Sequence, residues 1–382
     1  MKVTAVVITR DRPSQVQQLV ASILHSKMPP ITFVLVDDST RRNFEDTEKF
    51  LLSSKIIHEH RSSLQMRKEV ERVLKRMDLT ATQKTSIEAC VGSKSSFLEF
   101  ADSLSKINLF RSSFLDILSR SFSPYSSARN LGIYCACSAF DPERIVFLDD
   151  DCYIERPEKL MAALQLIGER LDGKEIIAVS GLYEDLALSK RKSRHRYEEL
   201  APTSILTGMS SFLKRSFLTD QQQRLTLMPH HTLGGALVLS RKVFMSLPFD
   251  PFIPRGEDHA YCVDLKQRCG RGFTIVRDNQ FVVQHGSQPK VSPNRQETNT
   301  LRDIFRFIYL QFKVGEHFIP YLTIRWATSA IIHMLLEAPK SRRRFIELWT
   351  LLFLARNYAK RNAGKYSETV KAWRSFLGEV VR

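Results

Sequence analysis

Residues 2–9 read KVTAVVIT, a nearly continuous apolar run that ends in the polar turn Arg10-Asp11-Arg12-Pro13. From Val16 to Leu24, apolar residues recur at the spacing of a helix, and a second apolar run over 31–36 ends at Asp37-Asp38. Strand, helix and strand in this order, with both strands apolar along their length, predict parallel pairing and a right-handed crossover. The sequence therefore predicts an α/β fold with a mostly parallel, Rossmann-like central sheet flanked by helices.

Further apolar runs predict additional strands, and helical spacing separates them. The expected strands cover 144–148, 176–180, 236–239, 273–276 and 280–283. The expected helices cover 127–139, 157–170 and 257–268, together with helical patches at 64–77 and 97–118.

Acidic residues follow three of these strands, at the point where each strand ends. Asp149-Asp150-Asp151 comes directly after the run 145–148, and the segments 9–12 and 37–38 occupy the same place on two other strands. Ligands of open α/β sheets bind at the carboxyl ends of the strands. Carboxylate oxygens suit Mg²⁺ or Mn²⁺, and a cation between Asp149, Asp151 and a diphosphate would relieve the repulsion among the acids. A solvated acidic turn is the alternative.

Other polar groups at this predicted rim suit a nucleotide. Asp37 and Asp38 can accept hydrogen bonds from a ribose or a base edge. Arg10, Arg12 and Arg129 carry planar guanidinium groups that bind phosphate or a base. Each of these residues alone is commonly an ordinary surface residue, but their shared position at strand ends favours a common site.

The formal charge of +16 favours an anionic partner, either nucleotide diphosphates, acidic polymers, nucleic acid or an anionic membrane, and it can also serve solubility alone. The N-terminal run predicts a buried strand and not a signal peptide, and no apolar run reaches the ~18 residues of a spanning helix. The six cysteines are scattered. Cys135 and Cys137 point to different sides of one predicted helix, which argues against zinc binding, and we expect a cytoplasmic protein.

The order of these motifs resembles that of glycosyltransferases with the GT-A fold, especially the inverting enzymes of family 2. The resemblance covers about 2–40 and 125–290. The matching segments are Val6–Pro13, Val36–Ser39, Ala128-Arg129-Asn130-Leu131-Gly132, Phe147–Asp151, Gly234-Gly235-Ala236, Gly256-Glu257-Asp258 and Val283-Gln284-His285-Gly286.

The resemblance implies a nucleotide-diphosphate sugar donor, Mn²⁺ or Mg²⁺, and an acceptor hydroxyl. It implies that Asp149 and Asp151 hold the metal, with His285 as a third ligand, and that Asp258 is the catalytic base. It also implies that Thr9, Arg12, Asp37 and Arg129 contact the nucleotide. We expect Arg10, Asp38, Asp149 and Asp150 to complete the set of donor-binding residues.

The chemistry of sugar transfer needs these roles. A divalent cation offsets the charge of a departing diphosphate, and a carboxylate must take the proton of the acceptor hydroxyl. Asp258 stands at the start of a predicted helix, whose dipole favours an ionised carboxylate, and Glu257 can orient the acceptor or tune that base. An ordinary helix cap at 257–258 and a rim histidine without a ligand role are the alternatives.

We expect a catalytic domain over 1–295, with a helical insertion at about 45–125 and an acceptor-side segment at about 182–290. The stretches between Ser39 and Ala128 and between Gly181 and Gly234 are longer than the family pattern and leave the acceptor open. Retaining GT-A enzymes share the acid pair, so the stereochemical outcome is also open. A sugar-phosphate nucleotidyltransferase would need a glycine-rich loop where this chain has Thr9–Pro13. A nucleic-acid-binding protein would need basic residues interleaved with aromatic ones, which we do not find, so we expect no nucleic acid partner.

Residues 296–382 form a basic, helical C-terminal region. Its part from residue 300 onward carries 15 Lys and Arg against 6 Asp and Glu. Arg325 and His333 argue against a spanning helix. The pattern suits either peripheral contact with an anionic membrane or packing on the catalytic domain or a second subunit.

Overall fold

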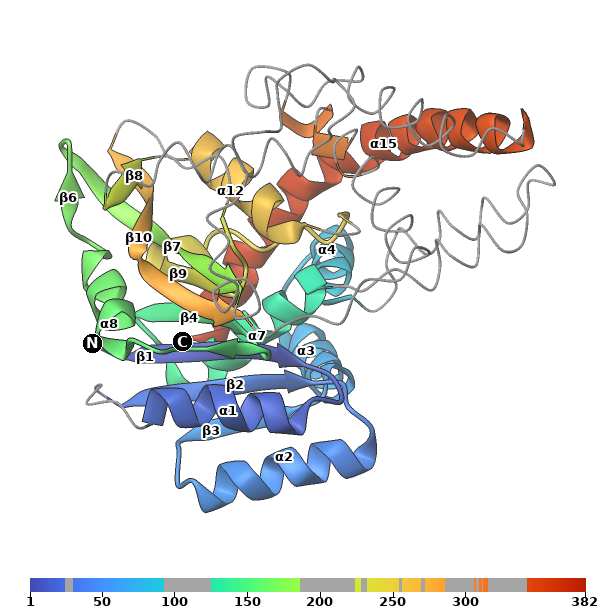
Figure 1. Ribbon diagram of the computed structural model, residues 1–382. Coiled ribbons are helices and arrows are strands. Elements are labelled where there is room, and N and C mark those ends of the chain that lie inside the picture. Colours follow the sequence, from blue (N-terminus) through green and yellow to red (C-terminus); the bar gives the residue numbers. More distant parts are fainter. Residues whose placement is uncertain are drawn as a thin grey trace.

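The computed structural model describes residues 1–24, 30–92, 125–185, 224–227, 232–253, 256–268, 272–285, 306, 309–310, 312–314 and 342–382. These residues form a mixed sheet with the order β3-β2-β1-β4-β9-β7-β10-β5, in which β6 adds to β7 and β8 to β10 (Figure 1). The strands are β1 (Val3–Thr9), β2 (Ile31–Asp37), β3 (His58–Arg61), β4 (Arg144–Asp149), β5 (Cys152–Tyr153), β6 (Arg170–Leu171), β7 (Lys174–Asp185), β8 (Leu225–Leu227), β9 (Ala236–Ser240) and β10 (Phe273–His285).

The predicted parallel core of the sheet is present. β1 pairs in parallel with β2 on one side and with β4 on the other, and β3 continues the parallel set beyond β2. β9 runs antiparallel to both β4 and β7, and β7 pairs in parallel with β10. The fold is therefore of the predicted α/β class.

Helices cover both faces of the sheet. They are α1 (Pro13–Leu24), α2 (Arg41–Ser53), α3 (Ser63–Arg76), α4 (Ala81–Val91), α7 (Tyr125–Phe140), α8 (Pro157–Leu166), α11 (Arg241–Phe244), α12 (Glu257–Arg268) and α15 (Arg342–Val380).

The alternation of side chains along β1 shows how the two faces are covered. Ala5 and Val7 belong to one apolar core with residues of α1, α2 and α8. Val6, which points the other way, belongs to a second core with residues of α3, α4, α7, α12 and α15. In Figure 1, α1 and α2 accordingly lie on the opposite side of the sheet from α4 and the C-terminal half of α15.

The segment predicted as a helical insertion, about 45–125, also contains a strand of the central sheet. Its described part contains α3 and α4, as the helical pattern indicates, but β3 pairs with β2 and extends the central sheet. The sequence of β3, His58-Glu59-His60-Arg61, has no apolar residue, because β3 is an edge strand with partly buried side chains. Hydrophobic periodicity therefore gives no signal for it. The predicted helical patch at 97–118 lies outside the described residues.

The two short strands predicted at 273–276 and 280–283 are one strand, β10, with an irregularity in its pairing between Arg277 and Val282. This irregularity accommodates the polar residues that interrupt the apolar pattern. The helix predicted at 157–170 ends earlier, at Leu166.

The C-terminal region contains α15, a helix of 39 residues. Tyr358, Tyr366 and Trp373 of this helix are buried in the core that covers one face of the sheet, and the Trp373 indole donates a hydrogen bond to the Phe244 carbonyl at 3.0 Å. The second half of α15 thus packs on the α/β body, beside α4 and α7. Within the described parts of the chain, none of the helices combines the length and apolarity that crossing a membrane requires.

Candidate active site at the carboxyl ends of the strands

The strand order places a switch point between β1 and β4. β2 and β3 lie on one side of β1, whereas β4, β9 and β7 lie on the other. The carboxyl ends of β1, β2 and β4 are level, since Thr9 pairs with Asp37 and Ile8 pairs with Asp149. β9 runs in the opposite direction, so Gly234-Gly235, just before it, meets the same rim. In open α/β sheets this is where ligands bind.

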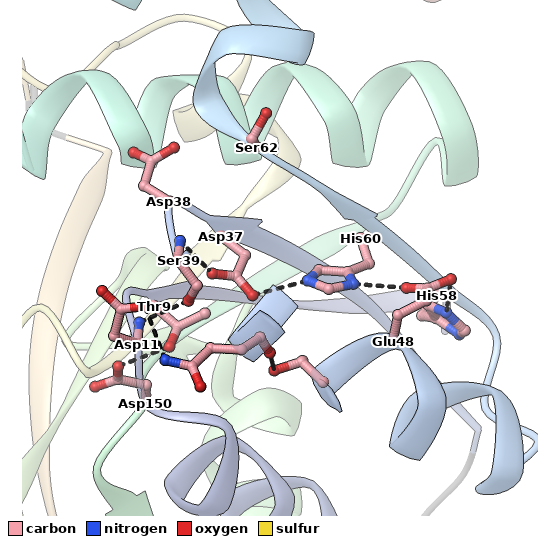
Figure 2. Close-up of polar contacts among 12 residues, drawn as sticks. Thr9, Asp11, Asp37, Asp38, Ser39, Glu48, His58, His60, Ser62 and Asp150 are labelled. Atoms are coloured by element: carbon pink, nitrogen blue, oxygen red, sulfur yellow. Dashed lines mark hydrogen bonds and ion pairs between the residues drawn. The ribbon is translucent and has the colours of Figure 1, made fainter. Parts of the chain in front are cut away.

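The three adjacent aspartates after β4 have different surroundings. Asp150 is 7% exposed and accepts a hydrogen bond from the Thr9 hydroxyl at 2.8 Å (Figure 2). Arg12 donates a second hydrogen bond to Asp150 at 2.9 Å. The pKa of the Asp150 carboxyl is above its ordinary value, because the effect of burial exceeds the opposing effect of the Arg12 charge. Asp150 thus ties the end of β1 to the end of β4.

Asp149 and Asp151 retain access to solvent, with side chains 33% and 13% exposed. One oxygen of each carboxylate and the Cys152 sulfur lie within 4.8 Å of one another, which is a suitable spacing for one cation. Cys152 is buried, and burial raises the pKa of its thiol well above the ordinary value. The two carboxylates are hard oxygen donors, which fits Mg²⁺ or Mn²⁺. Asp151 is also paired with Arg12 at 3.2 Å.

The predicted third ligand, His285, ends β10, where its backbone pairs with Cys152. This register brings the backbone of residue 285 next to the Asp149–Cys152 turn. Its side chain lies outside the described residues, so the ligand role remains a prediction.

Arg129 of α7 is a buried residue that connects Asp149, at the end of β4, with Glu257, at the start of α12. Its Nε donates to Glu257 at 3.1 Å, one terminal nitrogen donates to the Gly234 carbonyl at 2.7 Å, and the other donates to Asp149 at 3.3 Å. The guanidinium is buried over the Phe147 ring, and Glu257 and Asp149 raise its pKa in spite of burial. These described contacts are all to protein groups, so a donor contact of Arg129 stays a prediction.

Glu257 and Asp258 are the first residues of α12, and their surroundings differ. Asp258 is partly exposed, and its carboxylate accepts hydrogen bonds from the backbone amides of Gly234 at 3.1 Å and His259 at 2.7 Å. Glu257 is 7% exposed and bound to Arg129; burial raises its pKa, and Arg129 opposes that rise. Of the two roles predicted for Glu257, tuning the neighbouring base fits this geometry better than orienting an acceptor.

Tyr183 of β7 lies at the same rim, beside Asp149, and gave no signal in the sequence. Its hydroxyl donates to Asp149 Oδ2 at 2.6 Å and accepts a hydrogen bond from the Gly235 amide at 2.7 Å. A Cβ atom at Gly235 would collide with the Asp149 carboxylate and the Tyr183 hydroxyl. Only glycine permits this close approach.

The acids after β2 are engaged in the fold. Asp37 is fully buried; one of its oxygens accepts from the Ser39 amide at 2.9 Å and the other contacts His60 at 2.9 Å. The second ring nitrogen of His60 contacts Glu48, so that His60 lies between two carboxylates (Figure 2). A contact between Asp37 and a nucleotide, as predicted, would have to be made in addition to these bonds.

Asp38 accepts hydrogen bonds from the Ser63 amide at 2.9 Å and the Ser63 hydroxyl at 2.8 Å, at the start of α3. Asp11, in the left-handed region at φ 56°, accepts from the Thr40 amide at 2.7 Å and thereby joins the turns after β1 and β2. Arg10 is exposed beside this turn, as a donor contact requires. The part of the predicted site formed by the turns after β1 and β2 is therefore held together by hydrogen bonds between these two loops and α3.

No protein-family model matches the sequence, and no match was found among curated proteins. Solved structures similar to the chain include glucosyl-3-phosphoglycerate synthase from Mycobacterium tuberculosis in complex with Mn²⁺, UDP and phosphoglyceric acid, with 16% identity over 80% of this chain and 78% of that chain and a TM-score of 0.40. They also include Staphylococcus aureus TarS residues 1–349 in complex with UDP-GlcNAc, with 13% identity over 99% of this chain and 91% of that chain and a TM-score of 0.46.

Proposed function

We propose that the protein is a glycosyltransferase of the hexosyl type that uses a nucleotide-diphosphate sugar donor, assisted by Mn²⁺ or Mg²⁺. The observation that carries the proposal is the pair Gly234-Gly235, just before β9 at the rim of the sheet. The amide of Gly234 binds the carboxylate of Asp258, and the amide of Gly235 binds the Tyr183 hydroxyl, which in turn binds Asp149. Two adjacent backbone groups thus hold a candidate base and a candidate metal ligand side by side.

The residues divide the chemistry of sugar transfer between them. Asp149 and Asp151 would hold the cation, which supplies Lewis-acid stabilisation of the diphosphate leaving group when bound. Asp258 would take the proton of the acceptor hydroxyl, since its carboxylate is partly exposed and fixed by two amides. Glu257 and Arg129 would keep that carboxylate and Asp149 at a constant separation, because Arg129 binds both Glu257 and Asp149.

A base on the acceptor side suits direct displacement with inversion at the anomeric carbon. The remaining donor-side residues of the proposal are Thr9, Arg10, Arg12, Asp37, Asp38 and Asp150. Of these, Arg10 and the 41% exposed side chain of Arg12 are the best placed to reach a phosphate or base directly. Thr9, Asp37, Asp38 and Asp150 would act mainly by shaping the loops around the nucleotide.

A panel of nucleotide-sugars tests this proposal through thermal stability with and without Mn²⁺. A donor at 100 times its Kd should stabilise the folded protein by roughly 2.7 kcal/mol, because it binds only the folded state. We expect one donor to raise the melting temperature with Mn²⁺, excess chelator to abolish the shift, and Asp151→Asn to lose it. No response to any donor, together with DNA binding that weakens steeply with salt, would place the protein among nucleic-acid-binding proteins.

We further propose that the basic C-terminal region brings this enzyme to an anionic membrane surface in the cytoplasm. Arg356, Lys360, Arg361 and Lys365 are exposed along α15. Each basic residue near such a surface contributes roughly 1 kcal/mol, so binding to anionic vesicles should be strong at low salt and weak at high salt. Changing Arg342, Arg343 and Arg344 together to Ser should reduce co-sedimentation with anionic vesicles. A change of oligomeric state in this variant, with vesicle binding intact, would instead assign the segment to a subunit interface.

A further inference from the structure

Tyr183 is a polar residue at the rim to which the proposed mechanism gives no role of its own. It stands near the carboxyl end of β7, with its hydroxyl 2.6 Å from Asp149 Oδ2 and 2.7 Å from the Gly235 amide nitrogen. The Gly235 amide can only donate, so the phenolic oxygen is the acceptor of that bond. The single proton of the hydroxyl is therefore directed at Asp149.

Asp149 receives a second donor on its other oxygen, from Arg129 at 3.3 Å. Two donors on two different oxygens fix both the position and the plane of a carboxylate. Each oxygen keeps a further lone pair for a cation, and the side chain stays 33% exposed. The neighbouring Asp151 forms an ion pair with Arg12 at 3.2 Å, and the Arg12 side chain is 41% exposed.

The close packing around Gly235 shows that the backbone fixes the position of the Tyr183–Asp149 hydrogen bond. Any side chain at Gly235 would collide with both partners of the Tyr183–Asp149 bond. Arg129, the second donor, is itself held by Glu257 and by the Gly234 carbonyl. The orientation of Asp149 is thus coupled through backbone groups to the start of α12, where Asp258 lies.

We propose that Tyr183 is a positioning residue that presents Asp149 to a divalent cation and couples the metal side of the rim to Asp258 through Gly235 and Gly234. The identity of the cation rests on the proposed function. Outer partners of metal-binding side chains typically contribute 10–100-fold to metal affinity. Removing the Tyr183 hydroxyl should therefore weaken cation binding by this factor while the fold is retained.

The test is a titration with Mn²⁺ alone, in which the electron paramagnetic resonance signal of the free ion is followed for wild type, Tyr183→Phe, Asp149→Asn and the double variant. We expect Tyr183→Phe to raise the Kd for Mn²⁺ by 10–100-fold, and to have little further effect once Asp149 is Asn. Tyr358→Phe is the matched control, since it removes another hydroxyl hydrogen bond, to the Phe252 carbonyl at 3.2 Å, in a buried position on α15. It should leave the Kd unchanged.

The outcomes separate this inference from the proposed function. Wild-type protein that binds neither Mn²⁺ nor Mg²⁺ would overturn the metal site and the role of Tyr183 together. Wild-type binding that Tyr183→Phe leaves unchanged would overturn the role of Tyr183 alone. Equal losses in Tyr183→Phe and Tyr358→Phe would reduce that role to general stability. Should Tyr183→Phe fail to fold, Tyr183→His, which keeps a ring with a hydrogen-bond donor, provides the same comparison and should bind Mn²⁺ with intermediate affinity.

Discussion

The two halves of the rim carry the same sequence feature, adjacent aspartates at the end of a buried parallel strand, and use it differently. After β2, Asp37 is fully buried against His60 and the Ser39 amide, and Asp38 holds the first residue of α3. After β4, Asp149 and Asp151 also keep part of their surface in solvent, as the exposed Asp38 does, but one oxygen of each lies within 4.8 Å of the other, a spacing that suits a cation. One half uses its carboxylates to fix loops, and the other leaves two of them able to bind a cation.

The difference comes from what covers each strand end. Ser63, at the start of α3, binds both oxygens of Asp38, while the imidazole of His60 on β3 closes over Asp37. Opposite Asp149 the chain supplies Gly235, whose missing side chain leaves room for the carboxylate. A pair of acids at a strand end therefore indicates a rim, but the neighbouring elements decide whether it binds a ligand.

Asp258→Asn is the strongest way to test this division, because it removes the proposed base and changes the volume of the side chain little. Transfer should fall by roughly 10²–10⁴-fold, the usual contribution of a positioned base, while donor affinity stays nearly constant. The measurement is turnover with the identified donor beside the donor Kd from thermal shift. Asp46→Asn, an exposed position on α2, is the matched control and should leave both unchanged.

Two results would contradict this role for Asp258. Equal losses of donor binding and turnover would show that Asp258 supports the fold of the rim, through its bonds to the Gly234 and His259 amides. A product with retained anomeric configuration would remove the need for a base on the acceptor side and favour the retaining alternative.

The sequence predicted those features whose signal is local. Long apolar runs gave β1, β2, β4 and β9, and the Asp triplet marked the rim, because burial on both faces and clustered charge are visible within a few residues. β3 was missed, since an edge strand needs no apolar run.

Tyr183 and His60 were missed for a different reason. Tyr183 binds Asp149 across 34 residues and His60 binds Asp37 across 23, so only the sheet brings these partners together. No spacing rule marks a single polar side chain that bonds to a distant carboxylate. The same limitation hid the internal partners of Arg129, which lie up to 128 residues away.

The smallest effect we predict is that of Asp38→Ala, and it tests the comparison from the other side. Its two hydrogen bonds with Ser63 are lost, and the Ser63 amide at the start of α3 is left without its acceptor. An unsatisfied donor of this kind costs about 1–3 kcal/mol of unfolding free energy, measurable as a lower denaturation midpoint. The Kd for Mn²⁺ should stay constant, because Asp38 belongs to the loop-fixing half. Asp151→Ala should show the converse, with weaker Mn²⁺ binding and a smaller change in stability, since its ion pair with Arg12 is partly exposed. If Asp38→Ala instead weakened Mn²⁺ binding as much as Asp151→Ala, the two halves of the rim would form one coupled site, and the division of roles drawn from their hydrogen bonds would be wrong.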